Sequence, residues 1–155
     1  MKYDKETKTL TISYDFNEKL KNIQEDIEII IFENNNYSKF NQKVDNLPQN
    51  LTYLNLGCNF NQKVDKLPKN ITEIIFDFCF NQPVDNLPER LTKITFGYCF
   101  NKKVDNLPDS LTQITFGKMF NQMIEKMPLS IKEVKIYNIS LITKIPSECE
   151  IIELK

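Results

Sequence analysis

Residues 80–99 read FNQPVDNLPERLTKITFGYC, and this stretch decides the fold because the chain repeats its pattern every 20 residues. The opening phrase Phe-Asn-x-x-Val-Asp starts at Phe40, Phe60, Phe80 and Phe100, and a looser copy starts at Phe120. A tandem array of this period is typical of a solenoid, in which each unit packs only on its neighbours. The repeat therefore predicts the fold class, whereas it says far less about function.

Apolar residues hold fixed places within each unit. In the central unit they are Phe80, Val84, Leu87, Leu91, Ile94 and Phe96, and the units on either side repeat these offsets. A period of 20 fits neither a strand nor a helical turn, so it predicts a coil that returns to the same place. A looser unit starts at Phe16 and runs 24 residues, which places four extra residues within 33–39. The alternative of a helix over 17–33 is rejected because the repeat register passes through it.

Each unit contributes one short strand, and we expect about eight strands in a parallel sheet. They centre on residues 10–12, 29–32, 54–56, 74–76, 94–96, 114–116, 134–136 and 152–154. Six of the seven prolines follow an apolar residue at one position of the unit. Proline fixes φ and removes a ladder donor, so the opposite side should be extended or turned, with little or no α-helix.

The pattern organises the chain as a single repeat domain over residues 1–155. Residues 1–15 form an N-terminal cap with a hairpin arm and the first strand, 16–139 form the repeats, and 140–155 form a C-terminal partial repeat. All three glycines, Gly57, Gly97 and Gly117, directly follow a strand, and Asp77 replaces glycine in the remaining copy. Since Gly and Asp both tolerate φ > 0, we expect a tight left-handed turn there.

The fuller phrase resembles a known family. Leu51-Thr52-Tyr53-Leu54-Asn55-Leu56 is similar to the LxxLxL strand of leucine-rich repeats, and residues 87–97 closely match the FNIP repeat. The resemblance implies a β-rich, leucine-rich-repeat-like, right-handed coil. FNIP repeats are abundant in social amoebae and in giant viruses that infect amoebae, where an F-box often precedes them. About 15 residues precede the first full unit, so we do not expect an F-box or the ubiquitin-ligase adaptor function that goes with it.

Composition narrows the classes of partner. The net charge is −1 with mixed signs, which favours neither nucleic acid nor membrane. The first residues do not form a signal peptide and no apolar run is long enough for a membrane span, so we expect a cytoplasmic protein, in the host cytoplasm if it is viral. The four cysteines should be reduced thiols, although Cys79 and Cys99 would stack and could bridge under oxidising conditions.

Nothing in the sequence points to catalysis. The chain has no histidine, which removes histidine-based triads, proton transfer and most zinc sites. It also lacks a phosphate-binding loop, so we expect no enzyme and no cofactor. The column Asp45, Asp65, Asp85, Asp105 suits turn capping better than calcium, and the column Thr52, Thr72, Thr92, Thr112 suits β-branched strand positions better than an ice-binding array.

An asparagine column recurs with the repeat. Its members are Asn17, Asn41, Asn61, Asn81, Asn101 and Asn121. A buried amide can satisfy backbone groups that a bend sets free, once in each coil. We therefore interpret Asn41, Asn61, Asn81, Asn101 and Asn121 as a structural ladder and not as a ligand site.

Outward strand positions vary while the core repeats, and they are the candidates for binding a protein. The candidate residues are Tyr37, Tyr53, Ile75, Phe78, Lys93, Tyr98 and Lys118. Aromatic residues with charges around them suit a protein interface; alternatively, Phe78 and Tyr98 only cover the edge of a turn. The leading hypothesis is a non-enzymatic scaffold that binds a protein of unknown identity through the strand face and the 33–39 insertion. The alternative is a structural or spacer protein that self-associates as a homo-oligomer through its coil ends.

Overall fold

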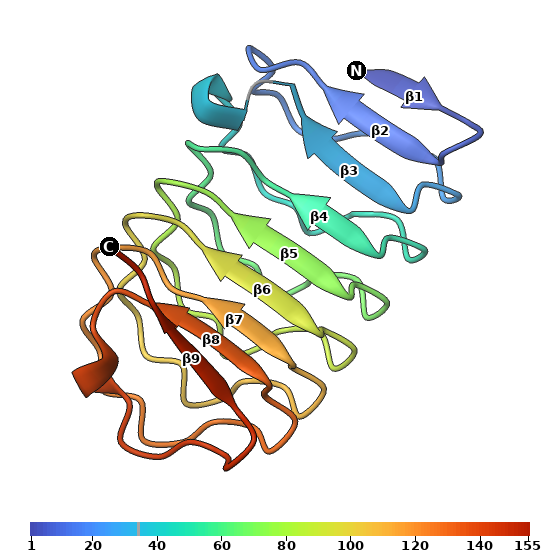
Figure 1. The fold of residues 1–155 in the computed structure, drawn as a ribbon. Helices are drawn as coiled ribbons and strands as arrows, with labels where there is room; N and C mark the ends of the chain where they lie inside the picture. Colours follow the sequence, from blue (N-terminus) through green and yellow to red (C-terminus); the bar gives the residue numbers. More distant parts are fainter. Residues whose placement is uncertain (34) are drawn as a thin grey trace.

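The computed structural model describes residues 1–33 and 35–155, and these form one β-solenoid with a sheet along one side (Figure 1). The nine strands lie in sequence order across the sheet. They are β1 Lys2–Asp4, β2 Thr9–Ile12, β3 Ile29–Phe32, β4 Tyr53–Asn55, β5 Glu73–Phe76, β6 Lys93–Phe96, β7 Gln113–Thr115, β8 Glu133–Ile136 and β9 Glu150–Glu153. Two short 3-10 turns, η1 Asn35–Tyr37 and η2 Ile139–Leu141, are the only helical elements among the described residues.

The eight predicted strands are present as β2 to β9, and all of them run parallel. The ninth strand, β1, is the predicted hairpin arm and pairs antiparallel with β2. One register differs from the prediction. The apolar pattern places Ile152 opposite Val134, whereas the structure pairs Val134 with Ile151. Ile152 lies as far after Pro146 as Val134 lies after Pro128, so β9 is shifted by one residue along β8 relative to the repeat.

The core lies between the sheet and the extended side, and it is built from columns of identical positions. Strand side chains alternate between buried and half-buried, which is the period of a strand with one face on a core. Phe60, Phe80 and Phe100 stack with ring centroids 6.1 and 6.0 Å apart. A second column that contains Phe76 and Phe96 contacts the first, at 3.8 Å between Phe76 and Phe80. Each coil therefore buries its rings only by having a neighbour.

Threonines join successive coils just before the strands. The hydroxyls of Thr52, Thr72, Thr92 and Thr112 donate to a backbone carbonyl of the preceding coil at 3.1, 3.1, 3.0 and 2.9 Å. The strand interpretation is wrong for these four residues, because each directly precedes its strand, whereas Thr95 and Thr115 of the same interpretation do lie in β6 and β7. The threonine hydroxyls give the bend a second donor beside the backbone N–H.

The glycine column is explained mainly by close approach of neighbouring coils. Gly57 has φ 71°, as predicted, but Gly97, Gly117 and Asp77 do not take positive φ. A Cβ on Gly97 would lie 2.2 Å from the carbonyl oxygen of Asp77, and one on Gly117 would lie 1.9 Å from that of Gly97. The prediction of a left-handed turn is thus wrong for three of the four copies, and at Gly97 and Gly117 the close approach of the adjacent backbone excludes a side chain.

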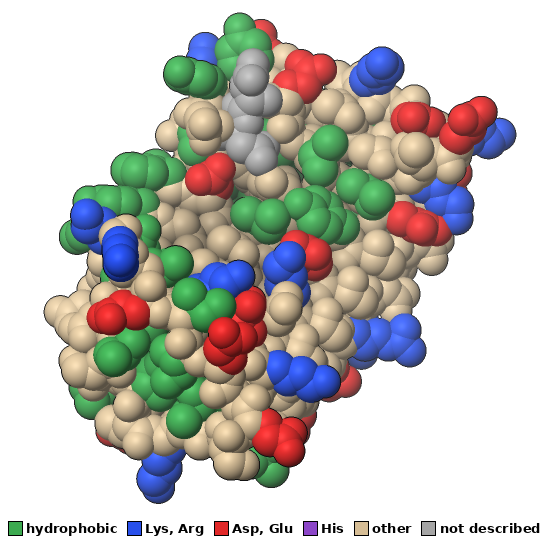
Figure 2. Space-filling view, in the orientation of Figure 1, with side chains coloured by type: hydrophobic (Ala, Val, Ile, Leu, Met, Phe, Trp, Pro, Cys, Tyr) green, Lys and Arg blue, Asp and Glu red, His purple; other side chains and the backbone are tan. Residues whose placement is uncertain are grey.

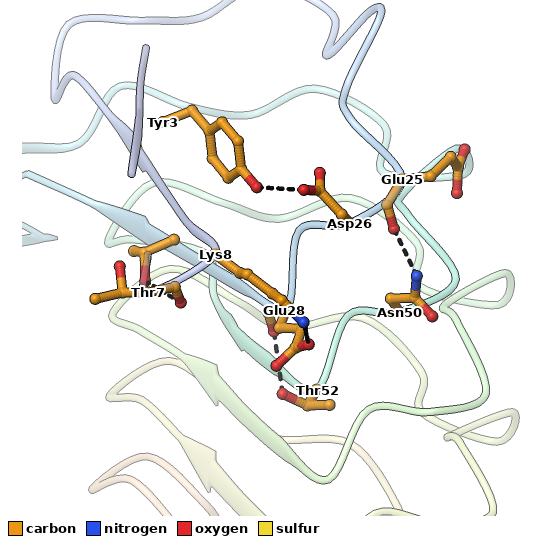
Figure 3. A network of polar contacts seen from close by, with 9 residues as sticks. Tyr3, Thr7, Lys8, Glu25, Asp26, Glu28, Asn50 and Thr52 are labelled. Atoms are coloured by element: carbon orange, nitrogen blue, oxygen red, sulfur yellow. Dashed lines mark hydrogen bonds and ion pairs between the residues drawn. The ribbon is translucent and has the colours of Figure 1, made fainter. Parts of the chain in front are cut away.

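Polar contacts fasten the N-terminal hairpin to the next coil (Figure 3). The Tyr3 hydroxyl donates to Asp26 Oδ2 at 2.7 Å, and Lys8 forms an ion pair with Glu28. The Asn50 amide donates to the carbonyl of Glu25 at 2.8 Å, which continues the connection one coil further. Tyr3 also packs on the core, so the hairpin covers part of this end of the solenoid.

Candidate protein-binding surfaces

A ridge of exposed apolar side chains follows the edge at which the parallel strands end. Of the ten large hydrophobic side chains exposed in the described part of the chain, six belong to it. This strand-end ridge consists of Tyr14, Tyr37, Phe78, Tyr98, Met119 and Ile139. Figure 2 shows hydrophobic side chains along the corresponding margin of the molecule. All six follow the C-terminal end of a strand, and because the parallel strands all end at the same edge of the sheet, the residues that follow them lie along one edge.

Phe78 and Tyr98 form the centre of the ridge. Their rings stack with centroids 4.9 Å apart and planes at 4°, and the side chains remain 49% and 42% exposed. Lys118 occupies the same position one coil further along. Two adjacent aromatic rings, each about half exposed, offer a rigid apolar surface of the kind that anchors protein contacts.

The outer face of the sheet carries a second apolar group. Its members are half-buried, and they are defined here as the sheet-face patch: Ile29, Ile31, Tyr53 and Ile75. Figure 2 shows this hydrophobic group over β3 to β5. Lys93 borders the patch and pairs with Glu73 at 3.1 Å. Burial, followed by the charge of Glu73, raises the pKa of Tyr53.

The predicted binding residues thus fall on two surfaces. Tyr53, Ile75 and Lys93 lie on the sheet face, whereas Tyr37, Phe78 and Tyr98 lie on the strand-end ridge. Sequence reasoning did not name Ile29 and Ile31, although the core positions of Ile30 and Phe32 place both of them on the outer face. It also missed Tyr14, Met119 and Ile139, although their positions in the repeat could have found them.

A groove opens beside the aromatic stack and brings the insertion to the ridge. It has a volume of about 620 Å³ and is lined by Asn36, Tyr37, Lys39, Cys58, Asn59, Asp77, Phe78 and Cys79. Ser38 is fully buried behind it, and its carbonyl accepts from the Asn59 amide at 2.7 Å. Of the predicted 33–39 contact segment, Asn34 lies outside the described residues.

The asparagine column forms one hydrogen bond per coil. The backbone N–H of Asn61, Asn81, Asn101 and Asn121 each donates to Oδ1 of the preceding asparagine at 2.9–3.0 Å. Glutamine amides of the next residue donate to the same oxygens in three of these steps. The amides are half-buried, and Asn121 is exposed, so the expectation of full burial is wrong. The side-chain oxygens of Asn41, Asn61, Asn81 and Asn101 are therefore engaged in bonds between coils, which supports a structural role for the column.

Metal-binding side chains are dispersed: the described residues include no cluster of three of them. Burial, followed by the charge of Asp77, raises the pKa of the Cys58 thiol, and burial with neighbouring thiols raises that of Cys79. Both thiols are therefore protonated near neutral pH, which disfavours nucleophilic chemistry.

No helix in the described part of the chain has the length and apolarity that crossing a membrane requires.

Comparison with known proteins gives a family and a structural neighbour. The FNIP Repeat family model matches residues 40–79, 60–99, 80–118 and 100–138. The giant-virus protein CroV588, described as a novel circular LRR protein, superposes with a TM-score of 0.78 at 33% sequence identity. The match covers 92% of this chain and 23% of that chain. No curated protein matches the sequence. The overlapping matches span most of the coils described above, and the chain belongs to the FNIP repeat family.

Proposed function

We propose that the chain is a non-enzymatic scaffold that binds a protein partner through the strand-end ridge. The observation that carries this proposal is the alignment of six exposed apolar side chains on one edge of a regular solenoid. A soluble surface rarely collects apolar side chains in this way unless they meet another macromolecule. The mixed charges around the ridge favour a protein over a nucleic acid or an anionic membrane.

The test compares the partners of two folded variants in extract from the organism that encodes the chain. Phe78→Ser/Tyr98→Ser removes the centre of the ridge, and Lys43→Ser/Lys63→Ser changes two exposed residues on the opposite side. Partners that the wild type and the lysine variant retain, but the aromatic variant loses, support the ridge as the binding surface. Identical partner lists for all three proteins would contradict it.

The second candidate function is self-association through the coil ends. It is favoured by the state of the last coil, in which Ile142, Ile145 and Cys149 are only half-buried and β9 forms the edge of the sheet. A solenoid end that lacks a polar cover tends to stack on another surface. The circular form of the similar giant-virus protein is consistent with coil ends that can be covered by further coils.

Sedimentation velocity over a range of concentrations separates the two candidates. A monomer at all concentrations contradicts self-association and leaves the ridge proposal intact. A concentration-dependent oligomer that Ile145→Lys abolishes, while Leu129→Lys on the preceding coil does not, supports association through the last coil.

A further inference from the structure

The exposed aromatic stack consists of Phe78 and Tyr98, and it does not continue to the coil before Phe78. Tyr98 covers one face of the Phe78 ring, and because the rings are parallel, the other face is turned toward the preceding coil. At the same position of the repeat that coil carries Cys58, which is buried and whose thiol donates to the carbonyl of Ser38 at 3.4 Å. The column itself therefore supplies no ring at this step.

The groove lies where the column lacks an aromatic ring, since both Cys58 and Phe78 line it. The groove is lined by Phe78 but not by Tyr98, so it lies on the free side of the stack. Its far wall is the insertion, where Tyr37 is 72% exposed. The buried Ser38 and its bond to Asn59 anchor this wall, which places Tyr37 across from the Phe78 ring.

Two opposite charges line the groove. Lys39 and Asp77 are both part of its lining, and neither belongs to an ion pair within the described residues. If an aromatic side chain of a partner stacked on Phe78, its hydroxyl or indole N–H would lie in a groove where the Asp77 carboxylate can accept a hydrogen bond. Lys39 would complement an acidic residue next to that aromatic residue in the partner's sequence.

We propose that the groove binds a tyrosine or tryptophan side chain of the protein partner, which continues the aromatic stack on the free face of Phe78. The inference rests on the proposed function, since it locates the main anchor of the strand-end ridge. Tyrosine and tryptophan combine a planar apolar body with a hydrogen-bond donor at the tip. Asp77 accepts from this donor, and Lys39 pairs with an acidic residue beside it.

Amide chemical shifts of the ¹⁵N-labelled chain test the site directly. The probes are N-acetyl-tyrosinamide and N-acetyl-tryptophanamide, with N-acetyl-leucinamide as an apolar control. We expect ring-current shifts at Tyr37 and Cys79, with affinity roughly threefold to tenfold above that of the leucine probe, the difference that one aromatic contact supplies. Phe78→Ser should abolish the shifts, and Tyr37→Ser should weaken binding from the opposite wall.

Two control variants use residues that the repeat itself offers. Asp77→Gly copies the residue found at this position in the next two coils. It should weaken N-acetyl-tyrosinamide by roughly threefold or more and leave N-acetyl-phenylalaninamide unchanged, because only the tyrosine loses a hydrogen bond. Lys118→Phe extends the stack at its other end and should leave the affinity of both probes unchanged.

Three results would overturn the proposal. They are shifts centred on Tyr98 and Lys118, equal binding of the leucine probe, or equal shifts with adenosine monophosphate, which would indicate a nucleobase site. If the probes fail while the partner still depends on Phe78 and Tyr98, the ridge binds its partner in another way and only the groove proposal is wrong. If the probes bind while no partner depends on the ridge, the proposed function is wrong and the aromatic site remains.

Discussion

At the scale of single residues, side chains at equivalent positions of the repeat make different contacts. Asn81 accepts a hydrogen bond from the backbone of Asn101, whereas no such donor to Asn121 is found among the described residues. Gly97 leaves no room for a Cβ, whereas Asp77 carries one at the same position. Matched pairs of this kind separate the contribution of a contact from that of a residue type.

Replacing Asn81 by alanine should lower the free energy of unfolding by about 1–2 kcal/mol, because the N–H of Asn101 loses its acceptor. The same change at Asn121 should cost less than about 0.5 kcal/mol, as is usual at an exposed site. Urea unfolding of both variants measures the difference. Equal costs would show that the column does not act as a ladder.

The substitution Gly97→Ala should destabilise the fold by about 1–3 kcal/mol, since the added methyl group would lie 2.2 Å from the carbonyl oxygen of Asp77. Asp77→Ala keeps the Cβ and should change stability by less than about 0.5 kcal/mol. Thermal unfolding of the two variants tests this contrast. A tolerated Gly97→Ala would mean that adjacent coils can move apart without cost.

At the scale of elements, the N-terminal hairpin depends on a few polar contacts to the second coil. The hydrogen bond to Asp26, followed by desolvation and the charge of Asp26, raises the pKa of Tyr3 to about 12. The unfolded chain releases this proton near the ordinary tyrosine pKa of 10.0. Since the folded state holds the proton more tightly, the contribution of Tyr3 is present below pH 10 and is lost as the pH rises to 12.

Raising the pH from 10 to 12 should therefore loosen the hairpin in the wild type. Tyr3→Phe lacks both the hydrogen bond and the titrating group, so the part of the pH dependence that Tyr3 causes should disappear. Absorbance at the phenolate band, followed together with hydrogen exchange of β1 and β2, measures both effects. The idea fails if the variant and the wild type lose protection in parallel over this pH range.

The elements also show how far a sequence of this kind predicts its structure. The strands, the extended side and the apolar columns follow from the 20-residue period, because each coil must repeat the contacts of the last. The register of β9, the cause of the glycine column and the half-burial of the asparagines did not follow. They depend on how closely coils approach one another, which the spacing of residues along one coil does not contain. The groove was also missed: Cys58 interrupts the aromatic column in the sequence, but only the fold places the insertion residues Tyr37 and Lys39 beside Phe78.

At the scale of the whole molecule, stability is shared between neighbours along one axis. Phe80 contacts rings on both adjacent coils, whereas Phe16 stacks only on Phe40 among the described residues. A destabilising substitution in the middle of the stack should therefore lower the stability of the coils on both sides, whereas one at the end should lower that of the terminal coil alone.

Phe80→Leu should lower global stability and the hydrogen-exchange protection of β3 to β8 together, by about 1–2 kcal/mol for the lost ring contacts. Phe16→Leu should reduce protection in β1 and β2 and leave β6 and β7 unchanged. Native-state hydrogen exchange resolved by strand makes the comparison. Uniform loss of protection in both variants would show that the molecule unfolds as one cooperative unit.

The threonine and asparagine hydrogen bonds also determine how the molecule responds to force. Each bond joins one coil to the next, so a chain pulled by one terminus loads only the bonds of the outermost coil. Release of one coil frees 20 residues, or roughly 70 Å of extended chain. A single molecule held in an optical trap should therefore lengthen in equal steps, and the longer coil with the 33–39 insertion should give a longer one. Under tension the solenoid should therefore unfold gradually, one coil at a time, whereas a globular domain of this size would unfold in a single step.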